Sequence, residues 1–185
     1  MGSLSKVQQQ LILGSVLGDG YLRKKVNAHL QITHSAKQKS YVDWKYNILK
    51  NIVITPPKFY KGNGSRVGYR FFTKSIPELT DFYDKFYQSG RKAVPKNLIL
   101  SPLSLAVWYM DDGSKSRRSG YLNCQQFDLA SQNNLVNSLK RFGIKGSLNK
   151  DKIYTRIYIS TEGMTKLVKL IKEFIVPSMR YKLLI

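Results

Sequence analysis

The spacing of apolar side chains along the chain switches repeatedly between the period of a helix and that of a strand. Residues 7–18 have helical spacing, and Gly20 predicts the end of that helix. Residues 21–35 instead alternate between apolar and polar side chains, which predicts a hairpin with one polar face that turns near residues 26–28. Helical spacing returns at 39–52 and 77–87, and the turn sequence at 62–65 predicts a second hairpin that joins 58–60 to 67–73.

The same order of elements returns in the second half of the chain. After a linker at 88–101, the pattern predicts a helix at 102–111, a strand at 121–127 and a helix at 129–142. A hairpin of 146–150 with 153–160 and a helix at 162–175 follow. Each half therefore has the order αββαββα, and we divide the α+β chain into two copies, residues 1–93 and 94–185. In this comparison Leu30–His34 aligns with Leu122–Gln126, so that Thr33 corresponds to Gln125.

Both copies begin with an apolar helix that ends in an acidic residue and a glycine. The endings are Leu17-Gly-Asp-Gly20 and Met110-Asp-Asp-Gly113, and they place Asp19 and Asp112 93 residues apart. The helix dipole disfavours a carboxylate at a helix C-terminus, so something must offset the negative charge. One Asp-Gly step would indicate only a turn, but two at matching positions favour a shared cation.

The first helix carries small residues that would let it pack closely against the second. Gly14 and Gly18 are four residues apart, and the clearest small residue of the second helix is Ala106. Paired helices would bring Asp19 and Asp112 together, and oxygen ligands without histidine or cysteine indicate Mg²⁺. A metal held by carboxylates next to a phosphate-binding surface suits phosphodiester hydrolysis. The backbone carbonyls of Gly18 and Asp111 are further ligand candidates, while the Asp111 side chain is either a third ligand or the partner of a nearby arginine.

Composition narrows the class of protein and of partner. The 185-residue chain has 31 Lys and Arg against 11 Asp and Glu, a net charge of +20, which indicates a polyanionic partner, above all nucleic acid. The single cysteine, Cys124, excludes a disulfide framework and a thiolate zinc site and fits a reducing compartment. No apolar stretch is long enough to predict a membrane span.

The polar faces of the predicted strands combine cations with amides. Cations suit phosphates, and glutamine and asparagine suit base edges in the major groove. We therefore expect these faces and the neighbouring basic residues to bind DNA. The set is Arg23, Lys25, His29, Gln31, Thr33, Arg66, Arg70, Lys115, Arg117, Arg118, Asn123, Gln125, Lys152 and Arg156.

The two acidic helix ends resemble the motifs of the LAGLIDADG homing endonucleases, in the form that carries two motifs in one chain. Residues 12–20 and 105–113 occupy the nine-residue motif, with Asp19 and Asp112 at its catalytic acid. Residues 101–115 and 175–183 look most similar to the subgroup typified by the omega-intron endonuclease of fungal mitochondria. The second motif departs from the pattern in having Val107 in place of the motif glycine.

This resemblance implies paired motif helices between two αββαββα halves, with two antiparallel sheets that form a saddle along DNA. It also implies metal-dependent cleavage of both strands with short 3′ overhangs, and it gives Lys92 and Lys182 catalytic roles. We expect a monomeric, intron-encoded endonuclease for double-stranded DNA at a long asymmetric site, in an organelle or a prokaryotic cytoplasm. The alternatives are a maturase that binds intron RNA and a non-catalytic DNA-binding regulator.

Overall fold

The first half of the chain folds around one antiparallel sheet. A computed structural model describes residues 4–183. Helix α1 (Lys6–Leu17) leads into strands β1 (Tyr21–Lys24) and β2 (Ala28–Ser35), and helix α2 (Lys39–Leu49) leads into β3 (Lys58–Lys61), β4 (Val67–Phe72) and helix α3 (Pro77–Phe86). The strand order in the sheet is β1-β2-β4-β3. The predicted elements of this half are confirmed to within a few residues.

The second half repeats this arrangement. It consists of α4 (Pro102–Asp112), β7 (Gly113–Ser116), β8 (Ser119–Asn123), α5 (Leu129–Lys140), β9 (Gly146–Asp151), β10 (Tyr154–Ile159) and α6 (Thr161–Ile171). The strand order, β7-β8-β10-β9, is the same as in the first sheet. The α+β fold with duplicated αββαββα halves is therefore confirmed. No helix within residues 4–183 has the length and apolarity to cross a bilayer.

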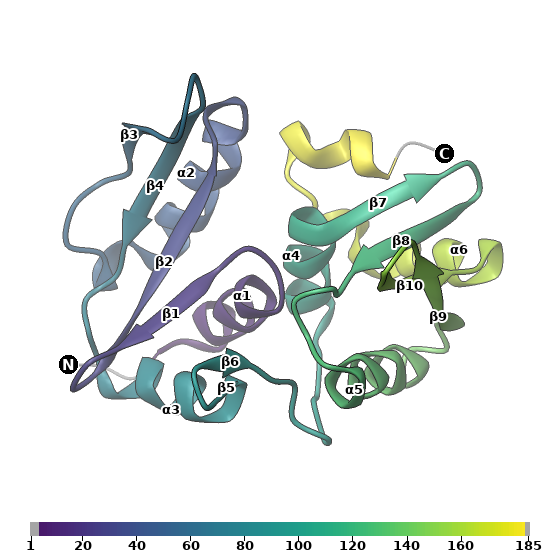
Figure 1. Ribbon diagram of the computed structural model, residues 1–185. Helices are drawn as coiled ribbons and strands as arrows, with labels where there is room; N and C mark the ends of the chain where they lie inside the picture. The colour runs from purple at the N-terminus through teal and green to yellow at the C-terminus, as the bar shows by residue number, and fades with distance from the viewer. Residues whose placement is uncertain (1–3, 184–185) are drawn as a thin grey trace.

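Helices α1 and α4 lie side by side at the centre of the molecule, with one sheet on each side (Figure 1). Each begins with a capping box, in which Ser5 or Ser101 exchanges hydrogen bonds with the residue three positions later. Gly14 allows the close approach, because a Cβ atom there would lie 2.4 Å from the carbonyl oxygen of Ser104 and 2.6 Å from Cβ of Val107. The glycine of the first motif thus accommodates the valine that replaces glycine in the second.

Three segments were not predicted. A short hairpin, β5 (Tyr87–Gln88) and β6 (Arg91–Lys92), lies in the expected linker, β7 precedes β8, and a 3₁₀ helix, η4 (Pro177–Lys182), follows α6. The β5–β6 hairpin positions Lys92, and η4 positions Lys182. Both lysines therefore come from segments whose sequence has no clear periodicity.

The alignment of the two copies is wrong by two residues. Tyr21 and Ser114 each follow their acidic residue by two positions, and their ladder partners are Gln31 and Tyr121. Thr33 therefore corresponds to Asn123, and an arginine lies opposite each of them, Arg70 in one sheet and Arg156 in the other. The difference arises because the turn that joins β7 to β8 is tighter than the turn that joins β1 to β2. It follows that Gln125 and Gln126 are not the counterparts of Thr33 and His34.

Candidate active site

The C-terminal ends of α1 and α4 open into one cavity. Asp19 and Asp112 line this cavity of about 450 Å³ together with Lys92, and Asn123, Gln125 and Gln126 of the second half line it as well. The helix pairing that the sequence predicted therefore does bring the two repeated acids together.

Asp112 has the environment of an unsatisfied metal ligand. Its Oδ2 atom is buried and has no hydrogen-bond partner among residues 4–183. Burial, with the nearby charges of Asp19 and Asp111, raises the pKa of Asp112 to about 7. Burial and Asp111 also raise the pKa of Asp19. A buried carboxylate oxygen without a donor is costly, so this pair of acids suits a bound cation.

Lys92 and Lys182 hold equivalent positions on the two motifs. Lys92 Nζ donates to the carbonyl of Gly18 at 2.9 Å, and Lys182 Nζ donates to the carbonyl of Asp111 at 2.9 Å. Each carbonyl belongs to the residue before the repeated acid, Asp19 or Asp112. Burial lowers the pKa of Lys92 to about 8, and it lowers the pKa of Lys182 as well. Both lysines thus lie at the ends of the two motifs, and they bind the carbonyls of Gly18 and Asp111, which the sequence offers as candidate metal ligands.

The side chain of Asp111 is occupied by a buried lysine. Lys45, from α2, donates to Asp111 Oδ1 and Oδ2 at 2.8 and 3.0 Å, and both side chains are fully buried. Tyr41 donates to Oδ1 at 2.7 Å, and the backbone N–H of Asp19 donates to Oδ2 at 3.2 Å. Burial alone would raise the pKa of Asp111, but Lys45 and these donors hold it below its usual value. The expectation of an arginine partner is wrong.

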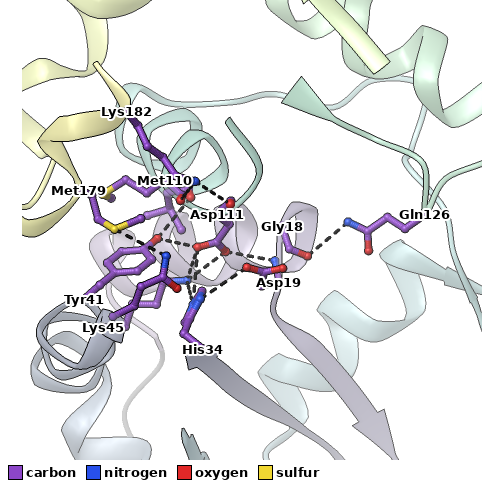
Figure 2. A network of polar contacts seen from close by, with 12 residues as sticks. Gly18, Asp19, His34, Tyr41, Lys45, Met110, Asp111, Gln126, Met179 and Lys182 are labelled. Atoms are coloured by element: carbon purple, nitrogen blue, oxygen red, sulfur yellow. Dashed lines mark hydrogen bonds and ion pairs between the residues drawn. The ribbon is translucent and has the colours of Figure 1, made fainter. Parts of the chain in front are cut away.

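A buried histidine joins this lysine to Asp19, the acid of the first motif (Figure 2). The Nε2 atom of His34 lies 3.3 Å from Lys45 Nζ, and its Nδ1 atom lies 3.5 Å from Asp19 Oδ2. Burial, together with Lys45, lowers the pKa of His34 to about 4. Ligand atoms of Asp19, His34 and Asp111 lie within 4.8 Å of one another, as in a metal site. The ammonium of Lys45, however, already supplies a cation beside His34 and Asp111, two of these three residues.

Gln126 is a second polar residue that sequence reasoning missed. Its side-chain amide donates to the carbonyls of Leu17 and Gly18 at 3.0 and 3.3 Å, and so satisfies the end of α1 from the opposite half. Neither Gln126 nor Lys45 stood out in the sequence, because their partners lie 108 and 66 residues away.

Most of the expected DNA-binding residues lie on the polar faces of the two sheets or at their loops. None of the fourteen is buried, and the ladder pairs Arg23–His29, Thr33–Arg70 and Asn123–Arg156 place each pair on one face. Lys115 is the exception. It lies opposite Gly120, whose Cβ position would meet Met164 of α6, so Lys115 is on the helix-covered side of the second sheet.

An arginine on each sheet packs over aromatic rings. The guanidinium of Arg70 lies 4.2 Å from the ring centre of Tyr60, and that of Arg156 lies 4.5 Å from the ring centre of Tyr121. Asp151 lies 3.2 Å from Nε of Arg156. These contacts hold planar donors upright on the sheet surface, which suits phosphate or base recognition.

Comparison with known proteins gives consistent matches over almost the whole chain. The model of the LAGLIDADG DNA endonuclease family matches residues 9–167. A probable intron-encoded endonuclease of Wickerhamomyces canadensis is 30% identical over 201 residues, which covers 98% of this chain and 86% of that protein. The cytochrome b mRNA maturase bI2 of Debaryomyces hansenii is 28% identical over 195 residues, which covers 97% and 74% of the two chains.

Two solved structures share the fold. The homing endonuclease I-WcaI, bound to its DNA recognition sequence, superposes with a TM-score of 0.92 at 27% identity and covers 100% of this chain and 88% of its own. I-DmoI, in complex with DNA and Mn, has a TM-score of 0.59 at 14% identity and covers 89% and 96% of the two chains.

Proposed function

Since this chain belongs to the LAGLIDADG DNA endonuclease family, we propose that it is an intron-encoded endonuclease that cuts double-stranded DNA at a long asymmetric site. The observation that carries the proposal is the cavity between the sheets, where both repeated acids meet and one carboxylate oxygen of Asp112 has no donor in the described part of the chain. A protein that only bound DNA would gain nothing from two acids that line one cavity at the centre of a strongly cationic surface, because they repel phosphate.

The residues at this cavity fit a divalent cation, which we take to be Mg²⁺. Asp19 and Asp112 would hold it, and the carbonyls of Gly18 and Asp111 lie beside them. The ion supplies Lewis-acid stabilisation of the phosphate and activates water for attack. Manganese accompanies DNA in the I-DmoI structure, which has the same fold. This supports a divalent metal here and leaves its identity to experiment.

Lys92 and Lys182 assist as proton donors. Lys92 donates to the carbonyl of Gly18, and Lys182 donates to the carbonyls of Met110 and Asp111, so each ammonium keeps at least one further N–H group for a phosphate oxygen or for the attacking water. Burial lowers the pKa of both lysines and so brings it closer to neutral pH, which suits a group that gives up a proton during the reaction. Because each lysine binds the equivalent carbonyl of one motif, we expect one lysine to act in the cleavage of each DNA strand.

DNA lies along the polar faces of the two sheets. Gln31 and Asn123 suit base edges, and Arg66 and Arg156 suit phosphates. We place the boundary between the halves at residues 93 and 94, so a single chain supplies both catalytic acids and acts as a monomer. The halves present different side chains, which matches an asymmetric target.

Two other functions have different support. The maturase of Debaryomyces hansenii is similar over nearly the whole chain, so assistance in the splicing of an intron RNA is the second candidate. A non-catalytic regulator on the same fold is disfavoured, because both acids and Lys92 line the cavity and Lys182 binds the carbonyl of Asp111 next to Asp112.

Conversion of either acid to its amide tests the catalytic proposal. We expect Asp19→Asn and Asp112→Asn to abolish Mg²⁺-dependent cleavage and to keep DNA affinity within about tenfold, since neither acid contributes to phosphate attraction. The assay is cleavage of the intron-less insertion site, with affinity measured in Ca²⁺, which is expected to support binding better than catalysis. Asp81→Asn, an exposed change on α3, is the control. Cleavage near the wild-type rate by either acid variant would contradict the role assigned to that residue.

A further inference from the structure

The two catalytic acids have different neighbours, although the halves share one fold. Asp19 has a buried imidazole at 3.5 Å, and the Oδ2 atom of Asp112 has no partner within residues 4–183. The ladder registers place Cys124 at the position equivalent to His34. Its thiol donates to the backbone carbonyl of Thr155 at 3.6 Å, so it cannot serve Asp112 in the same way.

The surroundings of His34 determine which ring nitrogen carries the proton. The ammonium of Lys45 has three protons and no lone pair, and three acceptors surround it: both carboxylate oxygens of Asp111 and Nε2 of His34. Nε2 therefore accepts a hydrogen bond from the ammonium at 3.3 Å, because the other group near it, Asp111 Oδ1, lies 3.7 Å away and is too distant to take a proton from Nε2 in a hydrogen bond. The ring proton then lies on Nδ1, which faces Asp19 Oδ2.

We propose that His34 is a positioning residue for the Asp19 carboxylate. The buried chain Asp111–Lys45–His34 sets its tautomer and directs the Nδ1–H toward Asp19. A proton donor on one carboxylate oxygen leaves the other oxygen, with a fixed orientation, for the cation. The 3.5 Å separation is longer than an ideal hydrogen bond, as is common for catalytic contacts before substrate binds.

One consequence is that the two strands of the target differ in their dependence on His34. Among the residues that the structure describes, only the centre at Asp19 has this donor, so loss of the imidazole slows cleavage of one strand and leaves the other unchanged. This consequence rests on the proposed nuclease function. The tautomer of His34 does not, and it can be observed in the metal-free protein.

The first experiment uses two amide variants that each replace one ring nitrogen. The side-chain amide of asparagine can present an N–H near the position of Nδ1. The longer side chain of glutamine instead places its amide toward Lys45, near the position of Nε2. We expect His34→Gln to slow nicking of one strand by about 10–100-fold, while His34→Asn retains more of that rate. The measurement is single-turnover cleavage of a duplex that carries a different dye on each strand. Thermal melting and DNA binding in Ca²⁺ show whether the variants are folded, and Cys124→Ala is the matched control in the other half.

The second experiment reads the tautomer directly. The chain has only two histidines, so ¹⁵N-histidine labelling with the variant His29→Gln assigns both rings. We expect a protonated Nδ1 and an unprotonated Nε2 for His34 in metal-free protein. A proton on Nε2, equal slowing of both strands, or no difference between the asparagine and glutamine variants would each overturn the inference. If the wild-type protein cuts no DNA, the proposed function fails, and the tautomer still tests the His34 arrangement.

Discussion

Replacement of the buried lysine Lys45 by methionine tests the internal ion pair that supports the site. Methionine fills a similar volume but leaves the carboxylate of Asp111 buried without its cation. Removal of one partner of such a pair costs about 3–5 kcal/mol, because the remaining charge is desolvated and uncompensated. For a chain of this size, that loss lowers the melting temperature by roughly 10 °C.

The loss is expected to depend on pH. In the wild-type protein the pKa of Asp111 lies below its unfolded value, so the pair stabilises the protein above about pH 4 and is lost below that. Without Lys45, burial raises the pKa of Asp111 instead, so the folded variant takes up a proton as the pH falls. The gap in stability between the two proteins therefore narrows from pH 7 toward pH 4.

Urea unfolding followed by tryptophan fluorescence measures these stabilities. Lys39→Met is the matched control, because Lys39 is an exposed lysine on the same helix and also pairs with an aspartate, Asp43. We expect little change from it, since exposed pairs contribute little. The double variant Lys45→Met/Asp111→Asn removes both charges and should recover most of the lost stability. If Lys45→Met were no more destabilising than Lys39→Met, the assignment of a buried, essential ion pair would be wrong.

Two further predictions concern charge. Because the pKa of Asp112 is raised to about 7, its protonated form favours the folded state, and metal-free protein should lose stability as the pH rises from about 4 to about 7. Asp112→Asn should reduce this loss, which urea unfolding in EDTA at several pH values would detect; equal slopes for the two proteins would count against the raised pKa. DNA affinity should fall by about 10³–10⁵-fold between 50 and 200 mM salt if 6–10 phosphates are contacted, as measured by fluorescence anisotropy. A flat salt dependence would refute the assignment of the polar sheet faces to DNA.

Regular periodicity is what made most of the fold predictable from sequence. Long amphipathic segments such as α6 and the β1–β2 hairpin follow directly from it, and Gly14 indicated the close helix pair. Strand β7 was missed because Ser114–Ser116 contains no apolar residue. Its pairing with β8 is what holds this segment in the conformation of a strand. The offset between the copies was misjudged because turn length, which sets the register, leaves only a weak trace in sequence.

The residues of the candidate site could be predicted from sequence where the same residue type recurs in both halves of the chain, and could not where it occurs in one half alone. Asp19 and Asp112 stood out because each ends an apolar helix. Lys45 looked like an ordinary surface lysine on a helix, and His34 like one more residue of an alternating strand. Their burial depends on Asp111, which comes from the other half of the chain. Such partners are set by tertiary packing, so no local pattern reports them.

The unequal residues that precede Asp19 and Asp112 make each half suited only to the other. A Cβ atom on Gly18 would lie 2.4 Å from Cβ of Asp111, so two copies of the second half would bring two aspartates into one space. Two copies of the first half would leave each Lys45 without a carboxylate. Pairing of two identical halves is thus disfavoured, by steric overlap for two second halves and by unpaired lysines for two first halves. Anyone who recombines halves from different endonucleases of this kind should therefore transfer Gly18, Lys45 and Asp111 as one unit.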